Sequence, residues 1–201
     1  MTTLGVILAG GRATRMGGGD KALLELGGRS LLARVIERLG PQVDGLVLNA
    51  NGDPARFAGF GLPVVADDPP DFAGPLAGVL AGMEAARARG ATHVVSAAAD
   101  TPFFPRDLAV RLREAATREG APLACAATPD PDGRLRDHPT FGLWPAALAG
   151  NLRAALAGGL RKVVLWTDAH GCARAAFDPG PPDPFFNVNT PEDLARAEAL
   201  A

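Results

Sequence analysis

Basic side chains follow a short apolar run near the N-terminus, within the segment GVILAGGRATRMGGGDKALLELGG (5–28). The paired glycines Gly10 and Gly11 end the apolar run, and Arg15 and Lys21 come after them. Glycines let backbone N–H groups approach phosphate oxygens closely. A guanidinium fork and a compact ammonium both suit a triphosphate. The segment therefore predicts an anion-binding loop, with a plain glycine-rich turn between strand and helix as the alternative.

Neither of the two common phosphate-binding motifs accounts for this segment. The P-loop requires Gly-Lys followed by Ser or Thr, and the chain contains no Gly-Lys pair. The dinucleotide fingerprint G-x-G-x-x-G is not supplied by GGRATR at residues 10–15. The second mismatch counts against a dinucleotide-dependent oxidoreductase.

A carboxylate follows another buried run, at Asp100 in VVSAAADTPFF (94–104). A carboxylate at the end of a strand suits Mg²⁺, which takes few protein ligands and keeps positions for phosphates. The alternative is a turn aspartate that bonds its own backbone. Asn49 and Asp67 also follow apolar runs, although Asp67 precedes two prolines, where Asp is common in ordinary turns.

The elements that must position these groups alternate between strand and helix. Strands are expected at 4–9, 45–49, 62–66, 93–99, 123–127 and 140–144, and helices at 30–39, 74–89, 105–119, 145–157, 160–168 and 190–200. Ser30 and Thr190 are expected N-caps, with Asp193 at the glutamate position of a capping box.

This alternation predicts an α/β fold with three layers, in which helices cover both faces of a mostly parallel central sheet. Open sheets of this kind bind ligands at the carboxyl ends of their strands. The glycine-rich loop, Asn49, Asp67 and Asp100 all follow predicted strands, so we expect them to meet at one rim.

Length and composition set the class of protein. The 201 residues predict a single domain over 1–201. A net charge of −2 gives no general attraction to nucleic acid or to anionic membranes. The apolar run at 6–9 is too short for a secretory signal or a membrane span, and the two cysteines, Cys125 and Cys172, form no disulfide or zinc pattern. We expect a cytoplasmic protein with no nucleic-acid or membrane partner.

The opening segment resembles the L-A-G-G-x-x-x-R-M-G signature, followed by a lysine, of nucleotidyltransferases with a Rossmann-like fold. Within that superfamily, the chain resembles the bacterial molybdenum cofactor guanylyltransferases. Further matching segments occur in family order: GPLAG (74–78), DTPF (100–103), DHPTFGLW (137–144), RKV (161–163) and NVNTPED (187–193). The opening motif indicates the superfamily, and the later segments together are more specific.

The resemblance implies roles for individual residues. Catalytic roles fall to Arg15, Lys21 and Asp100, and Asp100 is the implied ligand of a Mg²⁺ cofactor. The implied nucleotide-binding residues are Leu8, Ala9, Gly10, Gly11, Arg15, Lys21, Asn49, Asp67 and Asp100. The residues implied to lie toward the second substrate or the metal are Arg161, Lys162, Asn187 and Asn189. His138, in the family-like segment, is a further candidate for substrate contact, with an ordering hydrogen bond as the alternative.

The activity that the resemblance implies is transfer of GMP from GTP to molybdopterin, with release of pyrophosphate. Such a reaction needs positioning and charge neutralisation more than a protein nucleophile. The attacking phosphate is already anionic, so no strong general base is expected. GTP and molybdopterin are the expected partners, molybdenum-insertion and acceptor molybdoenzymes are further candidates, and the protein is expected to be a monomer.

Two alternatives remain open from the sequence. One is a cytidylyltransferase, or another nucleotidyltransferase of the same fold; relatives that use CTP resemble L-A-A-G where this chain has Ala9-Gly10-Gly11. We hypothesise that Gly10 leaves more room for the base and so favours guanine. The other is a non-catalytic nucleotide-binding protein, against which the combination of Arg15, Lys21 and Asp100 argues.

Overall fold

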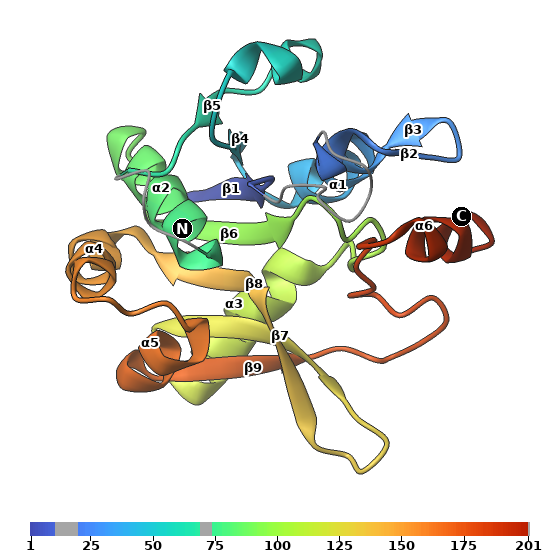
Figure 1. Ribbon diagram of the computed structural model, residues 1–201. Helices are drawn as coiled ribbons and strands as arrows, with labels where there is room; N and C mark the ends of the chain where they lie inside the picture. Colours follow the sequence, from blue (N-terminus) through green and yellow to red (C-terminus); the bar gives the residue numbers. More distant parts are fainter. Residues whose placement is uncertain (11–19, 69–73, 201) are drawn as a thin grey trace.

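The computed structural model describes residues 1–10, 20–68 and 74–200, and Figure 1 shows their arrangement. In this part of the chain, seven strands form the central sheet in the order β5-β4-β1-β6-β8-β7-β9. Their bounds are β1 Thr3–Leu8, β4 Gly45–Asn49, β5 Val64–Val65, β6 His93–Ala98, β7 Leu123–Pro129, β8 Leu135–Pro145 and β9 Cys172–Ala176. Strand β8 is antiparallel to β6 and β7, while the other strand pairs are parallel.

Helices cover both faces of this sheet (Figure 1). Helices α1 (Leu31–Leu39) and α3 (Leu108–Glu119) pack on one face, around a core that includes Ile7, Phe104 and Phe141. On the other face lie α2 (Pro75–Ala88), α4 (Ala149–Ala157) and α5 (Val163–His170). The predicted three-layer α/β fold with a mostly parallel sheet is therefore confirmed.

A smaller apolar cluster packs a hairpin from the N-terminal part of the chain against the C-terminal segment. It contains Leu26 from the hairpin of β2 (Glu25–Leu26) and β3 (Arg29–Ser30), together with Val188 and Ala197. Ala197 belongs to helix α6 (Pro191–Glu198). This cluster holds the segment before α6 against the rim of the sheet.

The predicted helix caps are confirmed. Ser30 Oγ accepts the backbone N–H of Ala33 at 3.1 Å. Thr190 and Asp193 form the reciprocal capping box at the start of α6, with distances of 3.2 Å and 3.0 Å.

Several predicted element boundaries are wrong. Helix α3 begins at Leu108 rather than at 105, because the side chain of Gln42 reaches across to accept the Ala109 N–H at 2.9 Å and caps the helix there. The strand expected at 62–66 shrinks to β5. The helix expected at 145–157 divides into the 3-10 turn Ala146–Leu148 and α4. The helix expected at 160–168 forms as α5, two to three residues later.

Strand pairs that the sequence does not predict complete the structure. Strand β9 has an Ala/Arg-rich sequence that gives no strand signal, and it forms by pairing with β7. The β2–β3 hairpin turns at Gly27 and Gly28, whose φ angles of 58° and 73° match a type I′ turn.

No helix in the described ranges is long and apolar enough to cross a membrane. Cys125 and Cys172 are free thiols.

Candidate active site

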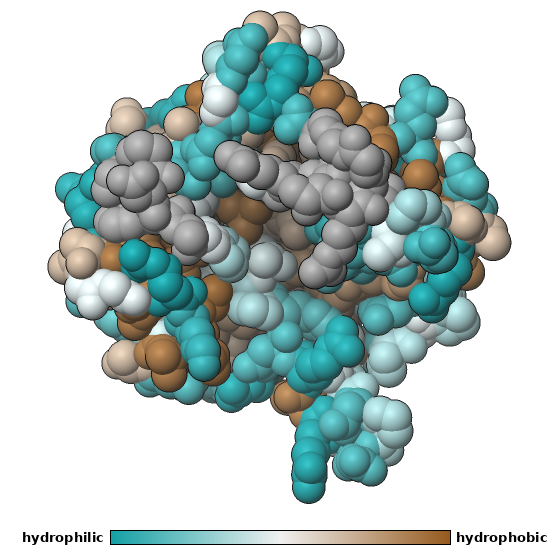
Figure 2. Space-filling model, viewed as in Figure 1, coloured by the Kyte–Doolittle hydropathy of each residue, from teal (hydrophilic) through white to brown (hydrophobic). Residues whose placement is uncertain are grey.

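Parallel pairing of β1, β4 and β6 brings the predicted site residues to one rim. Leu8, the last residue of β1, lies opposite Asn49 in β4 and Ala98 in β6. Ala9 N donates to Asn49 O at 2.9 Å, so the backbone leads directly to Gly10 beside these strand ends. Asp100 follows the end of β6. The face of the molecule seen in Figure 2 is hollowed near its centre. Gly11 and Arg15 lie outside the described residues.

Lys21 and Asp100 form an ion pair at this rim. Lys21 Nζ lies 2.5 Å from Asp100 Oδ2, and the two side chains are only 12% and 25% exposed. Lys21 Nζ also donates to Oδ1 of Asn189. Residues from the beginning, middle and end of the chain thus converge on one ammonium group. Partial burial reduces solvent screening of its charge.

The segment at 187–189 is held against Asp100. Val188 N donates to Asp100 O at 2.9 Å, and Thr101 Oγ1 donates to Asn187 Oδ1 at 2.5 Å. Asp193, in the capping box of α6, also accepts the Asn189 N–H at 3.0 Å. The structure therefore brings Asn187 and Asn189 to Asp100. Thr101 is a further member that the sequence reasoning missed, although its place next to Asp100 was the available signal.

Asn49 and Asp67 meet through a network of amides. Asn49 Nδ2 donates to Asp67 Oδ1 at 2.9 Å and to Val65 O at 3.2 Å. Asn51 Nδ2 donates to the other carboxylate oxygen of Asp67 at 2.7 Å, and Asn51 Oδ1 accepts the Asp67 N–H at 2.8 Å. Sequence reasoning missed Asn51, whose signal was a second amide two residues after Asn49. The network gives Asp67 a fixed orientation.

The first turns of α2 pack directly against this network. A Cβ added at Gly78 would lie 2.2 Å from Asn49 Oδ1 and 2.8 Å from Leu8 Cδ2. A side chain there would therefore displace Asn49. At Gly10, by contrast, a Cβ would meet no atom of the described residues within 4 Å.

Gly78→Ala is expected to destabilise the protein by about 1–3 kcal/mol, because the added methyl group overpacks the contact with Asn49. The measurement is the free energy of unfolding in urea. Gly150→Ala in α4 is the matched control, since a Cβ there meets nothing within 4 Å. It should leave stability unchanged or raise it by about 0.5–1 kcal/mol. Equal effects of the two substitutions would contradict the packing argument.

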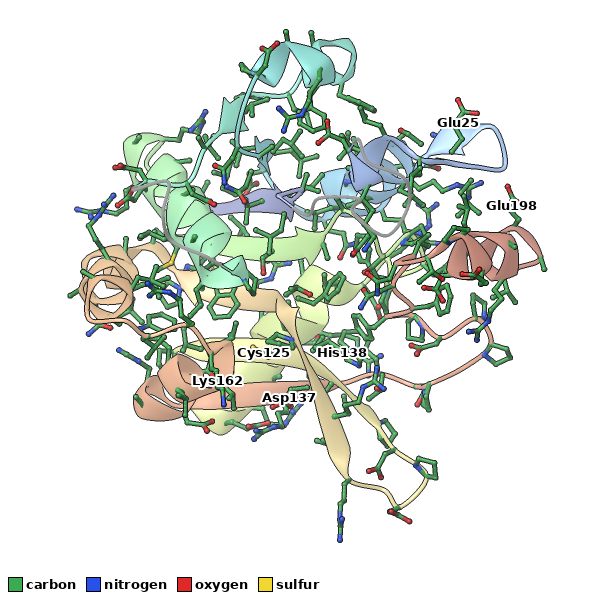
Figure 3. The ribbon with its side chains drawn as sticks, in the orientation of Figure 1. Glu25, Cys125, Asp137, His138, Lys162 and Glu198 are labelled. Carbon is green, nitrogen blue, oxygen red and sulfur yellow. The ribbon has the colours of Figure 1, made fainter. Side chains whose placement is uncertain are left out.

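His138 belongs to β8, and its side chain is buried (Figure 3). Its Nε2 lies 2.8 Å from Thr128 Oγ1, and its ring stacks on Phe185 with a centroid separation of 4.2 Å. Burial, aided by the positive charge of Arg136, lowers the pKa of His138 to about 4, against the opposing pull of Asp183 and Asp137. These contacts give the ring a packing role, and its predicted substrate contact stays a prediction.

The lowered pKa of His138 predicts a loss of stability in acid. Below pH 6.5 the unfolded chain binds a proton at this ring, whereas the native ring binds it only near pH 4. The native state is therefore penalised progressively as the pH falls from 6.5 to 4. Between pH 7 and pH 5, the wild type should lose about 2 kcal/mol more unfolding free energy than His138→Phe. Urea titrations at pH 7 and pH 5 measure this loss for each protein. An equal loss of unfolding free energy in the wild type and in His138→Phe would contradict the prediction.

Arg161 and Lys162 lie at the start of α5, outside the cluster around Lys21. Both are exposed, and Arg161 Nη1 donates to the carbonyls of Leu156 and Leu160 at 2.7 Å each. A Cβ added at Gly74, just before α2, would lie 3.9 Å from Arg161 O. The pair thus borders the beginning of the GPLAG segment, and Figure 3 shows Lys162 at α5.

The donors around Asp100 fit a hard cation. They are a carboxylate and the amide oxygens of Asn187 and Asn189, and oxygen donors are those that Mg²⁺ prefers. The described ranges contain no group of three or more His, Cys, Asp or Glu side chains that could hold a metal. Mg²⁺ commonly binds through one or two carboxylates plus substrate phosphates, and this donor set agrees with that mode.

A mostly parallel sheet with helices on both faces is the Rossmann-like fold of nucleotidyltransferases. Solved structures share this fold. The structure described as molybdopterin-guanine dinucleotide biosynthesis protein A, from Archaeoglobus fulgidus, superposes with a TM-score of 0.73 at 23% identity, over 98% of this chain and 97% of that one. A CMP:2-keto-3-deoxy-manno-octonic acid synthetase with CTP gives a TM-score of 0.76 at 17% identity, over 100% and 98%.

Sequence comparison defines the family more closely. The MobA-like NTP transferase domain model matches residues 5–171. The chain is 55% identical to the molybdenum cofactor guanylyltransferase of Rhodopseudomonas palustris, over 99% of this chain and 94% of the relative. It is also 55% identical to that of Cereibacter sphaeroides, over 100% and 97%. The chain belongs to the molybdenum cofactor guanylyltransferase family.

Proposed function

We propose that the protein transfers GMP from GTP to molybdopterin, or to its molybdenum-loaded form, and releases pyrophosphate. The observation that carries the proposal is the convergence of Lys21, Asp100 and Asn189 at the strand ends of a chain with this family membership. The family resemblance favours GTP over CTP, and the lack of any described atom within 4 Å of a Cβ at Gly10 agrees with a purine base.

In the proposed reaction, a phosphate oxygen of molybdopterin forms a bond to the α-phosphorus of GTP. The bond from that phosphorus to the oxygen of the β-phosphate breaks, and pyrophosphate leaves with the electron pair. Lys21 Nζ exchanges its contact with Asp100 for phosphate oxygens and so neutralises charge where it accumulates. Arg15 is proposed to assist from the glycine-rich segment.

We also propose Mg²⁺ as the cofactor, bound by Asp100 with the neighbouring amide oxygens of Asn187 and Asn189. When bound, the ion would neutralise phosphate charge and orient the triphosphate. Lys21 and Asp100 pair with each other; with MgGTP bound, Lys21 would contact phosphate oxygens and Asp100 would hold the ion. The ion pair therefore supplies the site with a neutral resting state.

We propose that the nucleoside is recognised at the rim beyond β4, with Leu8, Ala9, Gly10 and Gly11 as the binding residues. Both oxygens of Asp67 already accept amide hydrogens from Asn49 and Asn51, and each keeps a lone pair for a donor of guanine or ribose. Such an orientation costs no rearrangement when the nucleoside binds. Arg161, Lys162 and His138 are proposed to lie on the side of the molybdopterin.

The wider setting is proposed from the same family membership. The protein would act in the cytoplasm as a monomer. It would pass its product toward acceptor molybdoenzymes and work alongside the proteins that insert molybdenum. Neither nucleic acid nor membrane takes part in this scheme.

A nucleotide panel tests the proposal. Purified protein with molybdopterin and Mg²⁺ is given GTP, CTP, ATP or UTP, and pyrophosphate release is measured, with omission of molybdopterin as the control. GTP is expected to exceed CTP in kcat/KM by on the order of 10²-fold or more, since an oriented polar site rejects a base that leaves it unpaired. A preference for CTP would make the protein a cytidylyltransferase and overturn the proposal.

A further inference from the structure

An ion pair joins the segment that leads into Lys21 to the 3-10 helix after β4. Arg56 Nε lies 2.6 Å from Asp20 Oδ2, and the side chains are 27% and 24% exposed. Asp20 is the residue immediately before Lys21. Arg56 belongs to the 3-10 helix Pro54–Phe60, which follows β4. The contact therefore links the lysine segment to the segment that carries Asn51.

Arg56 is itself rigidly held. Its Nη1 donates to Asp53 O at 2.6 Å and its Nη2 donates to Asn51 O at 2.5 Å. The guanidinium carbon lies 4.6 Å from the ring centroid of Phe57, which is buried in the core. The guanidinium thus has little rotational freedom left to lose when it contacts Asp20, so the ion pair costs less entropy than one between two mobile side chains.

Asp20 fixes the backbone of Lys21. The carbonyl of Asp20 accepts the N–H of Leu23 at 3.0 Å and starts the short 3-10 turn Lys21–Leu23, while its carboxylate faces Arg56. Lys21 is then anchored at two points, through its backbone by Asp20 and through its ammonium group by Asp100 and Asn189. The second anchor must be released for a triphosphate to bind, which leaves Asp20 as the anchor that persists.

The charge of Asp20 adds a second requirement. A carboxylate one residue from the phosphate-binding lysine would repel a triphosphate unless a cation compensates it. Arg56 is that cation, and its Nη2 also supports Asn51, whose side chain orients Asp67. One guanidinium therefore contacts both halves of the candidate site.

We propose that Arg56 is a positioning residue for nucleotidyl transfer: through Asp20 it fixes Lys21 for the triphosphate, and through Asn51 it fixes the nucleoside side. The inference rests on the proposed function for its kinetic consequence. Its structural half, control of Lys21 by Arg56, can be tested without any substrate.

Lysine labelling tests that structural half. The chain contains two lysines, Lys21 and Lys162, so an amine-reactive ester followed by mass spectrometry of peptides reports each rate separately. In the wild type, Lys21 should react more slowly than the exposed Lys162. Arg56→Ala and Asp20→Asn should each raise the Lys21 rate several-fold relative to Lys162, and the double variant should add nothing to either. An unchanged ratio in the folded variants would overturn the inference.

Kinetics test the catalytic half. Arg56→Ala should lower kcat for pyrophosphate release by on the order of 10- to 100-fold, because a displaced lysine no longer meets the transition state. Asp20→Asn should recover part of the GTP affinity when combined with Arg56→Ala, since it removes the uncompensated charge, without restoring kcat. Arg118→Ala is the matched control: its ion pair with Glu119, at 3.1 Å, is exposed on α3.

The outcomes separate this inference from the proposed function. If the wild type releases no pyrophosphate from GTP, the proposed function fails, and labelling alone decides the role of Arg56. If the wild type is active and Arg56→Ala keeps its kcat, the inference fails while the function stands. A general loss of structure would speed labelling of both lysines and lower the melting temperature, and this result would also reject a positioning role.

Discussion

Lys21→Ala is expected to reduce kcat for pyrophosphate release by on the order of 10³-fold, while the protein stays folded. The ammonium of Lys21 is held at the strand ends by Asp100 and Asn189, where no other described lysine or arginine contacts Asp100. Charge that develops on the leaving pyrophosphate would then lack its fixed partner. The loss should appear mainly in kcat, since a triphosphate keeps other contacts in the ground state.

The control for this prediction is structural. Partly exposed ion pairs contribute about 0–1 kcal/mol to stability, so the urea midpoint of Lys21→Ala should move little. Lys21→Arg retains the positive charge but not the compact ammonium. Its kcat for pyrophosphate release should therefore lie between those of the wild type and Lys21→Ala. Normal pyrophosphate release by Lys21→Ala would remove Lys21 from the mechanism.

Asp100→Ala is the second substitution with a large expected effect. It removes the partner of Lys21 and the proposed ligand of Mg²⁺ at once, so activity should fall by on the order of 10³-fold. Asp100→Asn keeps an oxygen donor and loses the charge. It should therefore retain more activity than Asp100→Ala and require a higher Mg²⁺ concentration for half-maximal rate.

A titration of rate against Mg²⁺ concentration measures this effect. Asp107→Asn provides the matched control, because Asp107 is an exposed carboxylate before α3 that lies 3.9 Å from Arg111. It should leave both the rate and the Mg²⁺ requirement unchanged. If Asp100→Ala shows the wild-type rate and the wild-type Mg²⁺ dependence, Asp100 is neither the metal ligand nor the partner that sets up Lys21.

Sequence patterns predict those strands and helix caps that depend on residues close together in the chain. The apolar runs at β1, β4 and β6, and the caps at Ser30 and Thr190, depend on burial and on neighbours within a few residues. Parallel pairing then places Asn49 and Asp100 at one rim, which follows from strand direction alone. Strand β9 is different, because it depends on its pairing with β7, nearly 50 residues earlier.

The candidate site divides in the same way. Lys21 and Asp100 could be singled out from residue type and position after a strand. Asn189 lies 168 residues from Lys21, and no local pattern predicts their contact. The family resemblance indicated Asn189 only as a residue toward the second substrate or the metal. No sequence pattern predicts Asn51 and Arg56 as site residues, because their contacts are hydrogen bonds to other polar groups within the β4–β5 connection.

Transfer of the GMP group of GTP to molybdopterin can be tested through the identity of the product. Protein, molybdopterin, Mg²⁺ and GTP labelled at the α-phosphate are incubated, and the products are separated and weighed by mass spectrometry. The label is expected to enter a pterin–guanine dinucleotide, with one pyrophosphate released for each dinucleotide formed. Label found only in free GMP or GDP, with molybdopterin unchanged, would contradict it.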